Sequence, residues 1–278
     1  MSVDDSGTSE QPSAEDDVPV AGTGEVKIRV QNIRKRFGRV VALDGVDLDI
    51  YGNEIFALVG DNGAGKSTLM NIVSGVFEPT EGEIYKDGER VEFTNPSDAR
   101  DAGIETVYQD LALMGDLDIA TNIFMGQFPT AGIGPARFID WDETYERTRE
   151  IIHERLGREK MNPQTEVQFL SGGQRQLVAV ARTLAFDPDV IILDEPTSAL
   201  SVDAARLVHD TIQYLKEEEG ITVIIVSHSI EDVLQFSDRI GVLYQGQLVD
   251  ITTPDESNLE SLTTLMTTGS YQDDLIAD

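Results

Sequence analysis

One short segment constrains the fold of this chain more than any other, a glycine-rich loop between a buried strand and a helix. The segment "GDNGAGKST", Gly60 to Thr68, fits the phosphate-loop pattern G-x-x-x-x-G-K-[ST]. It follows "EIFALVG", an apolar run typical of a strand buried on both faces, and precedes "LMNIVSGV", which has helical apolar spacing. A helix-opening glycine turn without phosphate chemistry is the plainer alternative. The flanking strand and helix favour the phosphate-binding start of a βα unit.

Each residue type in this loop suits phosphate chemistry. The glycines let backbone N–H groups turn toward phosphate oxygens, and the following helix presents the positive end of its dipole. Lys66 is expected to reach the β- and γ-phosphates, and the Ser67 hydroxyl to bind Mg²⁺. The predicted nucleotide-binding residues of the loop are Gly60, Asp61, Asn62, Gly63, Ala64, Gly65, Lys66, Ser67 and Thr68.

A second apolar run, "VIILDEP", ends in two adjacent carboxylates. Asp194, at the end of the expected strand, is placed where a carboxylate can hold the magnesium shell. Glu195 points elsewhere and could polarise a water for attack on the γ-phosphate. Alone, Asp-Glu after an apolar run would more often be a solvated turn. Together with the phosphate loop, the pair indicates nucleotide hydrolysis.

A third segment, "LSGGQRQ", places a serine and two glycines at the start of the expected helix "QRQLVAVARTL". Ser171, Gly172 and Gly173 would stand where unpaired N–H groups and a dipole worth about half a positive charge favour an anion. A serine N-cap followed by loop glycines would be the preferred interpretation if the motif stood alone. The chain would then have two anion-binding helix starts.

The remaining pattern predicts an α/β domain with a mostly parallel core sheet. Half-buried strands are expected at "VKIRV" and "VDLDI", and βα alternation returns after residue 170. A short helix over 230–236 and the hairpin "RIGVLYQGQLVDI" close the domain. Residues 114–168 are charged and helical with no strong strand, which predicts a helical lobe completed by a helix over 171–186. The predicted organisation is a disordered acidic tail at 1–24, a domain over 25–270 and a short acidic tail at 271–278.

The net charge of −30 limits the partners of the chain. The first 24 residues hold six acids and no base, so the rest still carries −24 and would repel nucleic acid and anionic lipid. Only six of the 21 basic residues are lysine, a composition typical of proteins in molar salt, where the Debye length is about 3 Å. An ordinary acidic soluble protein is the alternative.

Three absences in the sequence narrow the class of protein. There is no cysteine, so neither a disulfide framework nor a thiolate metal site is possible. No apolar run reaches the roughly 18 residues of a membrane span. The amino terminus lacks the apolar region of a secretory signal, which makes the cytoplasm the expected compartment.

Taken in order, these motifs resemble those of the nucleotide-binding subunits of ABC transporters, over nearly all of residues 25–269. "GDNGAGKST" matches the Walker A motif, "VIILDEP" the Walker B motif and "LSGGQ", which ends at Gln174, the family signature. The resemblance gives roles to Gln109 in "VYQD" at the Q-loop and to His228 in "IVSHS" at the switch histidine. It also gives a role to Phe37 in "KRFG", at the aromatic that stacks on adenine. Judged by the neighbouring sequence alone, Phe37 could equally be a core residue, and His228 could be a core histidine with a satisfied hydrogen bond.

The resemblance implies a specific assembly and a set of cofactors. The fold would be a phosphate-loop NTPase domain with an antiparallel β subdomain and a helical subdomain. Two chains would form a head-to-tail homodimer, with each ATP between one subunit's Walker A motif and the other's signature. Glu195, His228 and Gln109 would be catalytic, and Ser67, Gln109 and Asp194 would bind Mg²⁺. The chain departs from many members at Ser201, where they have an aspartate, which puts any carboxylate contact there in doubt.

Within the family, "FTNPSDARDAGIETVYQDLAL", "NIFMGQ" and "FIDWDE" look like the ATPases of simple-sugar importers of the ribose, xylose and fructose type. The expected partners are a membrane permease and, through it, a solute-binding protein, with this chain bound at the cytoplasmic face of the membrane. An importer of another solute, such as nucleosides, is an alternative. A soluble ABC ATPase of DNA repair, translation or iron–sulfur assembly is disfavoured by the short gap between Walker A and signature and by the charge, so no nucleic acid is expected as a partner.

Overall fold

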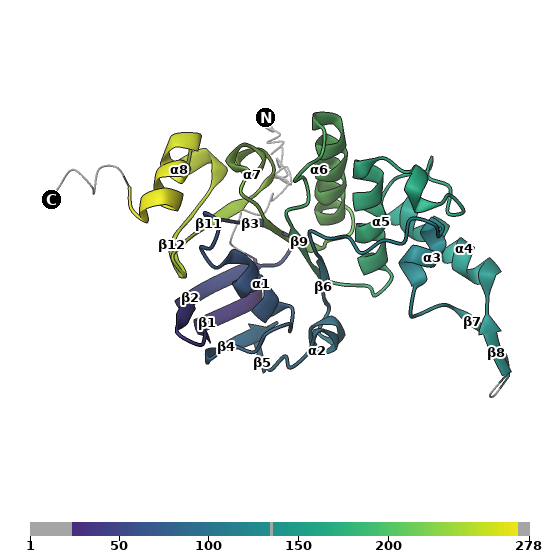
Figure 1. The fold of residues 1–278 in the computed structure, drawn as a ribbon, viewed down its shortest axis with the longest axis horizontal. Coiled ribbons are helices and arrows are strands. Elements are labelled where there is room, and N and C mark those ends of the chain that lie inside the picture. Colours follow the sequence, from purple (N-terminus) through teal and green to yellow (C-terminus); the bar gives the residue numbers. More distant parts are fainter. Residues whose placement is uncertain (1–23, 134–135, 272–278) are drawn as a thin grey trace, which may run out of the picture.

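A six-stranded, mostly parallel sheet forms the centre of the chain in the computed structural model, which describes residues 24–133 and 136–271 (Figure 1). The predicted acidic tails, 1–24 and 271–278, lie almost wholly outside this range. The strand order is β12-β11-β3-β10-β9-β6, and only β12 runs antiparallel to its neighbour. The strands are β3 (Ile55–Val59), β6 (Ile104–Val107), β9 (Val190–Asp194), β10 (Thr222–Val226), β11 (Arg239–Tyr244) and β12 (Gln247–Thr252).

This sheet explains where the site can form. Every residue of β3 is buried, as its continuous apolar run predicted for a strand covered on both faces, and every residue of β10 is buried as well. In the parallel register, Leu58 of β3 lies beside Val226 of β10, which lies beside Asp194 of β9. The carboxyl ends of the three central strands therefore meet at one edge, where ligands bind in open α/β sheets.

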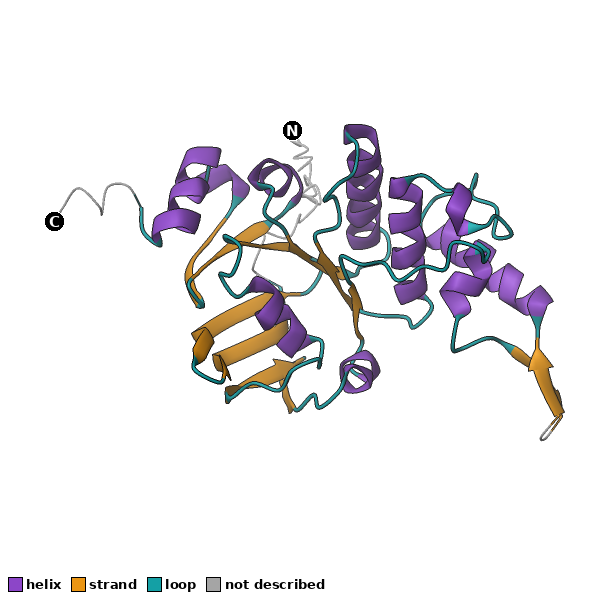
Figure 2. Ribbon diagram, viewed as in Figure 1, coloured by secondary structure: helices purple, strands orange, loops and turns teal. Residues whose placement is uncertain are grey.

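Helices cover both faces of the central sheet (Figure 2). The strand β3 is followed by α1 (Lys66–Val73), whose buried residues pack against both the central sheet and the second sheet. The second sheet is antiparallel, in the order β2-β1-β4-β5. The remaining elements here are β1 (Val26–Phe37), β2 (Val40–Tyr51), β4 (Glu81–Lys86), β5 (Glu89–Val91), α2 (Pro96–Asp101), α6 (Val202–Glu217), α7 (Ile230–Phe236) and α8 (Leu259–Thr268).

A helical lobe extends to the right of the central sheet in Figure 1. It contains α3 (Ile119–Phe124), α4 (Trp141–Arg149), a π-helix (Glu150–Arg155) and α5 (Gly172–Leu184). Residues of α3, the π-helix and α5 share a continuous apolar core. No strong strand was expected in this lobe, and the structure adds a short antiparallel hairpin, β7 (Thr130–Ile133) and β8 (Ala136–Ile139), that projects from it. The hairpin is held by local pairing of two four-residue strands, too short to give an alternating pattern.

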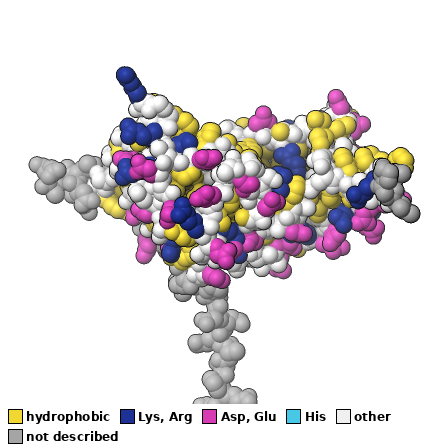
Figure 3. Space-filling model, turned by 90° about the horizontal axis from the view of Figure 1, so that it is seen from below, with side chains coloured by type: hydrophobic (Ala, Val, Ile, Leu, Met, Phe, Trp, Pro, Cys, Tyr) yellow, Lys and Arg dark blue, Asp and Glu magenta, His cyan; other side chains and the backbone are white. Residues whose placement is uncertain are grey.

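The fold class predicted from the motifs is confirmed, since the structure is an α/β domain with a mixed sheet and a helical lobe. The proposed domain boundaries at residues 25 and 270 stay a prediction. The helix α8 was not foreseen; it buries Leu262, Leu265 and Met266 against α7 and β11. Within the described part of the chain, no helix has the length and apolarity that a bilayer span requires. Acidic side chains are spread along the face in Figure 3, with basic ones among them.

Candidate functional site

A cavity of about 490 Å³ lies at the carboxyl edge of the central sheet. It is built by the loop after β3, the start of α1, the ends of β9 and β10, the segment after β6 and the start of β2. These elements come from widely separated parts of the sequence, and the fold brings them together. The lining residues are Val40, Val41, Ala42, Asn62, Gly63, Gly65, Lys66, Ser67, Thr68, Gln109, Asp194, Glu195 and His228.

The phosphate loop needs its glycines for two physical reasons. Gly65 has φ +109° and caps α1, and a Cβ there would lie 2.7 Å from the Ala42 carbonyl oxygen. Gly60 has φ +156°, and a Cβ there would overlap the Leu243 carbonyl oxygen of β11. Only glycine fits such a conformation and such an approach. The glycines therefore let the loop pack directly against β2 and β11.

Lys66 is almost fully buried and curls back over the loop that precedes it. Its ammonium donates hydrogen bonds to the carbonyl oxygens of Gly60, at 2.5 Å, and Asp61, at 3.2 Å. Burial lowers the pKa of Lys66, although Glu195 and Asp194 oppose that shift. Lys66 is thus a partly desolvated cation whose present acceptors are neutral carbonyls. A phosphate oxygen would be a stronger acceptor for it.

Two carboxylates, those of Asp194 and Glu195, lie in the cavity wall at the end of β9. Burial raises the pKa of Asp194, the adjacent Glu195 adds to the rise, and Lys66 opposes it. Glu195 has φ +53°, the left-handed region that is costly for a non-glycine residue. Its Oε2 lies 2.5 Å from Nδ1 of His228, and its side chain is 15% exposed against 61% for His228. The two predicted catalytic residues therefore meet, although 33 residues separate them.

The donor set beside Lys66 fits a hard divalent cation. Ser67, Gln109 and Asp194 all line the cavity and offer a hydroxyl, an amide oxygen and a carboxylate. Oxygen ligands of these kinds suit Mg²⁺, which usually takes one or two carboxylates together with phosphate oxygens and waters. In residues 24–133 and 136–271, no group of three or more His, Cys, Asp or Glu residues could hold a metal on its own. A cation here would therefore rely on the ligand's oxygens.

Some predicted site residues lie outside the cavity lining. Phe37 is 43% exposed and packs edge-on against Phe77, with ring centroids 5.4 Å apart. The loop residues that do not line the cavity are Gly60, Asp61 and Ala64.

The signature residues Ser171, Gly172, Gly173 and Gln174 also lie away from this cavity. Ser171 is exposed and caps α5, since its Oγ accepts from the Gln174 N–H at 3.3 Å. In return, the Gln174 Oε1 accepts from the Ser171 N–H at 3.0 Å. A Cβ on Gly173 would lie 3.1 Å from the carbonyl oxygen of Ala204 in α6, so glycine permits close packing of the two helices. The signature therefore forms a capped helix start at which Ser171 is exposed and Gly173 is buried.

Sequence reasoning missed the apolar wall of the cavity. Val40, Val41 and Ala42 line it from the start of β2, and Val40 is 65% exposed. The available signal was two adjacent valines directly after a glycine turn, "GRVVA", where a strand should alternate with polar residues. Exposed apolar side chains beside a phosphate loop indicate a surface for a flat apolar ligand group.

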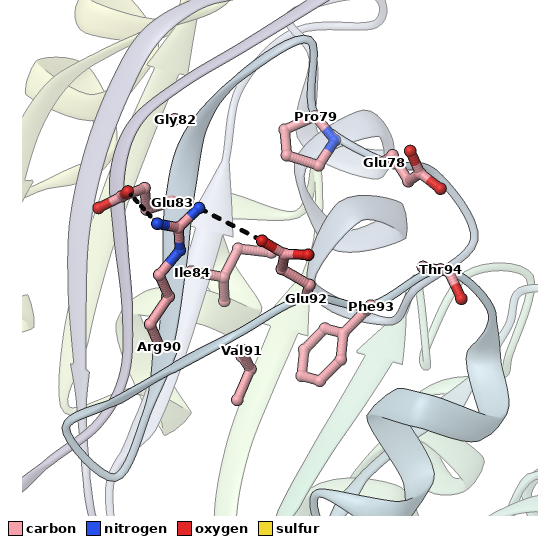
Figure 4. A pocket seen from close by; sticks show the side chains of 10 residues that line it. All are labelled: Glu78, Pro79, Gly82, Glu83, Ile84, Arg90, Val91, Glu92, Phe93 and Thr94. Carbon is pink, nitrogen blue, oxygen red and sulfur yellow. Dashed lines mark hydrogen bonds and ion pairs between the residues drawn. The ribbon is translucent and has the colours of Figure 1, made fainter.

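A second cavity, of about 210 Å³, lies between β4 and β5 (Figure 4). Its one basic lining residue, Arg90, pairs with Glu83 at 2.8 Å and with Glu92 at 3.3 Å. The arginine charge is therefore already neutralised by carboxylates. This cavity lacks the donors that an anionic ligand needs.

Comparison with known proteins gives a consistent family. A family model described as "ABC transporter" matches residues 43–198. The xylose/arabinose import ATP-binding protein XylG of Sulfolobus acidocaldarius is 42% identical over 240 residues, covering 86% of this chain and 93% of that protein. The fructose import ATP-binding protein FrcA of Rhizobium meliloti is 40% identical, with 86% and 93% covered. The ribose import ATP-binding protein RbsA 2 of Escherichia coli O157:H7 is 38% identical, but the match spans only 46% of it.

Solved structures agree with this result. The ADP conformation of MJ1267, an ATP-binding cassette of an ABC transporter, superposes with a TM-score of 0.74 and 26% identity. The match covers 91% of this chain and 99% of that structure. A dimeric post-hydrolysis state of the cassette MJ0796, bound to ADP and Pi, has a TM-score of 0.66 and 29% identity, covering 82% and 98%.

Proposed function

The chain belongs to the ABC transporter family of ATP-binding proteins, and on that premise we propose that it hydrolyses ATP to energise import of a simple sugar through a separate membrane permease. One observation carries the ATPase part: Lys66, Asp194, Glu195 and His228 converge on a single cavity. The sugar part is supported by relatives of similar length that are named for xylose, arabinose and fructose import.

The proposed binding mode assigns each part of the nucleotide to a wall of the cavity. The phosphates would accept hydrogen bonds from the loop backbone and from Lys66, which would exchange carbonyl acceptors for charged ones. The adenine would cover Val40 and Val41, whose exposure it would remove. Phe37, at the end of β1 just before the turn that leads to this wall, would stack on the base after moving from its contact with Phe77.

Mg²⁺ would be held by Ser67, Gln109 and Asp194, and it would neutralise charge between the β- and γ-phosphates. Glu195 would orient a water against the γ-phosphorus and take up its proton on a carboxylate oxygen. His228, within 2.5 Å of that carboxylate, would contact the γ-phosphate from the β10 side of the cavity. The low exposure of Glu195 would limit competing bulk water.

We propose that the working unit is a homodimer with ATP at the interface. The signature residues do not line the cavity of their own chain, and the exposed Ser171 caps the helix start that they form. Such a start suits a phosphate bound by another copy. A membrane permease, to which the chain would bind at the cytoplasmic face, and through it a solute-binding protein, complete the proposed assembly. The charge of −30 speaks against nucleic acid as a partner.

The decisive test is ATP hydrolysis by the purified chain and by Glu195→Gln. The variant should bind ATP but lose about 10²–10³-fold in turnover, the scale of one lost transition-state contact. Glu218→Gln, the same change at an exposed helix end, is the matched control and should keep wild-type turnover. Near-normal turnover in Glu195→Gln would remove Glu195 from catalysis. Uptake of labelled xylose, ribose or nucleosides by cells carrying the chain and its permease separates sugar import from the alternative.

A further inference from the structure

The loops that carry Glu195 and His228 are joined by a side-chain hydrogen bond. Thr197, two residues after Glu195, donates its hydroxyl to Oδ2 of Asp232 at 2.9 Å. Asp232 is four residues after His228, in the first turn of α7. The bond therefore spans 35 residues of sequence and links the segment after β9 to the segment after β10.

Glu195 needs such support because its backbone is strained. A glutamate at φ +53° costs about 1–2 kcal/mol, and it keeps this conformation only where its surroundings hold it. Its N–H donates to Val226 O at 2.9 Å, and its carbonyl accepts from the Ser198 hydroxyl at 2.9 Å. Those bonds hold the backbone at Glu195 itself. The hydroxyl of Thr197 holds the next turn of the segment against α7.

Asp232 has little freedom to move away from this contact. Its backbone N–H donates to the Oγ of Ser229, the residue that caps α7. His209 of α6 approaches the same carboxylate oxygen, with Nε2 3.9 Å from Oδ2. His209 is buried and stacks on Phe236, with ring centroids 3.6 Å apart. Asp232 thus meets both the segment after β9 and α6, while its side chain stays 33% exposed.

The bond is only partly shielded from solvent. The cavity left among Thr197, His209, Asp232 and their neighbours is about 10 Å³, but the Asp232 side chain is 33% exposed. Water on the exposed side of the carboxylate would solvate its charge without holding Thr197 against α7. Removing either partner would therefore release the segment after β9, which could relax from its strained form.

We propose that Thr197 and Asp232 form a positioning pair that fixes Glu195 relative to His228. The inference rests on the proposed ATPase function and deepens it. Neither residue lines the nucleotide cavity, so neither is a catalytic residue. Their loss should reduce the rate of the chemical step and leave nucleotide affinity unchanged.

The test compares kcat, KM for ATP and melting temperature of the full chain in five variants. They are Thr197→Val, Thr197→Ser, Asp232→Ala, the double variant Thr197→Val/Asp232→Ala, and Thr252→Val. The last variant is a matched control, since Thr252 is buried in β12 and its hydroxyl lies 2.7 Å from that of Ser257, on the strand at the edge of the central sheet.

Thr197→Val should lower kcat by about 10–100-fold, the range for losing one hydrogen bond to a charged group, with KM within about twofold. Thr197→Ser keeps the hydroxyl and should stay within about threefold of wild type. The double variant should be no worse than the poorer single variant, because both remove the same bond. Thr252→Val should keep wild-type kcat.

Three results would overturn the pair: wild-type kcat in Thr197→Val, equal damage in Thr197→Ser, or fold losses that multiply in the double variant. If Thr197→Val does not fold, Thr197→Ala takes its place and must give the same loss. Wild-type protein without turnover would refute the proposed function and the pair with it. Normal wild-type turnover that Glu195→Gln abolishes and Thr197→Val leaves intact would refute the pair alone.

Discussion

A heterodimer of one Lys66→Ala chain and one Ser171→Asp chain should hydrolyse ATP in a single turnover to about half the wild-type extent, if its two sites act independently. The reason is that the phosphate loop and the signature helix start of one chain would serve different ATP molecules. One site then combines both lesions, and the other combines an intact Lys66 with an intact Ser171. If each chain built its own site, both sites would carry a lesion.

The size of each lesion follows from the structure. Lys66 is the basic residue of the loop, and alanine in its place leaves no ammonium for the phosphates. Ser171 caps α5, and aspartate is as good an N-cap as serine, so Ser171→Asp should change the free energy of unfolding little. A carboxylate about 4 Å from a phosphate at an effective dielectric of about 20 costs about 4 kcal/mol, or about a thousandfold.

The assay needs a defined heterodimer and two homodimer controls. The two variants carry different affinity tags, are mixed without nucleotide and are purified in sequence for both tags. Single-turnover hydrolysis then avoids assuming that both sites must act together. Each mutant homodimer should have under about 1% of wild-type activity, because each of its sites carries one full lesion.

One result refutes the trans arrangement. If the heterodimer is no faster than the average of the two homodimers, each chain builds its own site and the signature helix does not serve a partner's ATP. Circular dichroism and melting of the Ser171→Asp homodimer show whether α5 is intact. A melting temperature close to wild type excludes loss of the cap as the cause.

Two further predictions concern ionisable groups. The melting temperature should rise between about 0.1 M and about 1 M KCl, because salt screens the repulsion of a chain with net charge −30; a flat or falling curve would contradict the high-salt interpretation. Burial lowers the pKa of His209 from 6.5, so as pH falls the unfolded state takes up its proton first and stability is lost below about pH 6.5. Urea unfolding of wild type should therefore weaken more between about pH 7 and pH 5.5 than that of His209→Gln, and parallel curves would contradict this.

Where a motif fixes the backbone, the sequence was sufficient to predict the structure. The strand β3, the loop after it and α1 appear where the phosphate-loop pattern and its flanking apolar runs indicated. The short helix over 230–236 has the predicted bounds. Asp194 ends β9, because the apolar run stops there. These features depend on residues that are close together in the sequence, so the sequence alone is enough to predict them.

Two elements were missed because their local signals are weak. The helix α8 reads "LESLTTLMTT", and threonine has low helix propensity. Its buried residues Leu262, Leu265 and Met266, at spacings of three and four, were the available indication. The strand β7 contains a glycine, and β8 lacks the alternation of apolar and polar residues that is typical of a strand. Neither segment was therefore predicted to be a strand.

The contacts that define the site could not be read from the chain at all. Glu195 meets His228, and Thr197 meets Asp232, only because β9 and β10 are neighbours in a parallel sheet. Sequence spacing contains no information on which strands pair. The left-handed backbone at Glu195 was equally hidden, since glutamate carries no preference for it. Family resemblance supplied the role of His228, whereas its distance from Glu195 came from the fold.

The charge of the cavity explains why a chain this acidic would need Mg²⁺ to hold ATP. Among the lining residues, the one ammonium of Lys66 faces two carboxylates, Asp194 and Glu195, so the side chains alone do not attract a triphosphate. Backbone N–H groups of the loop and the start of α1 supply partial positive charge, but they leave the carboxylates uncompensated. The pKa of Asp194 is raised because burial and the negative charge of Glu195 both disfavour its charged form, which agrees with a shortage of positive charge in the cavity. A divalent cation beside Asp194 would oppose that shift, because it favours the charged form of the carboxylate.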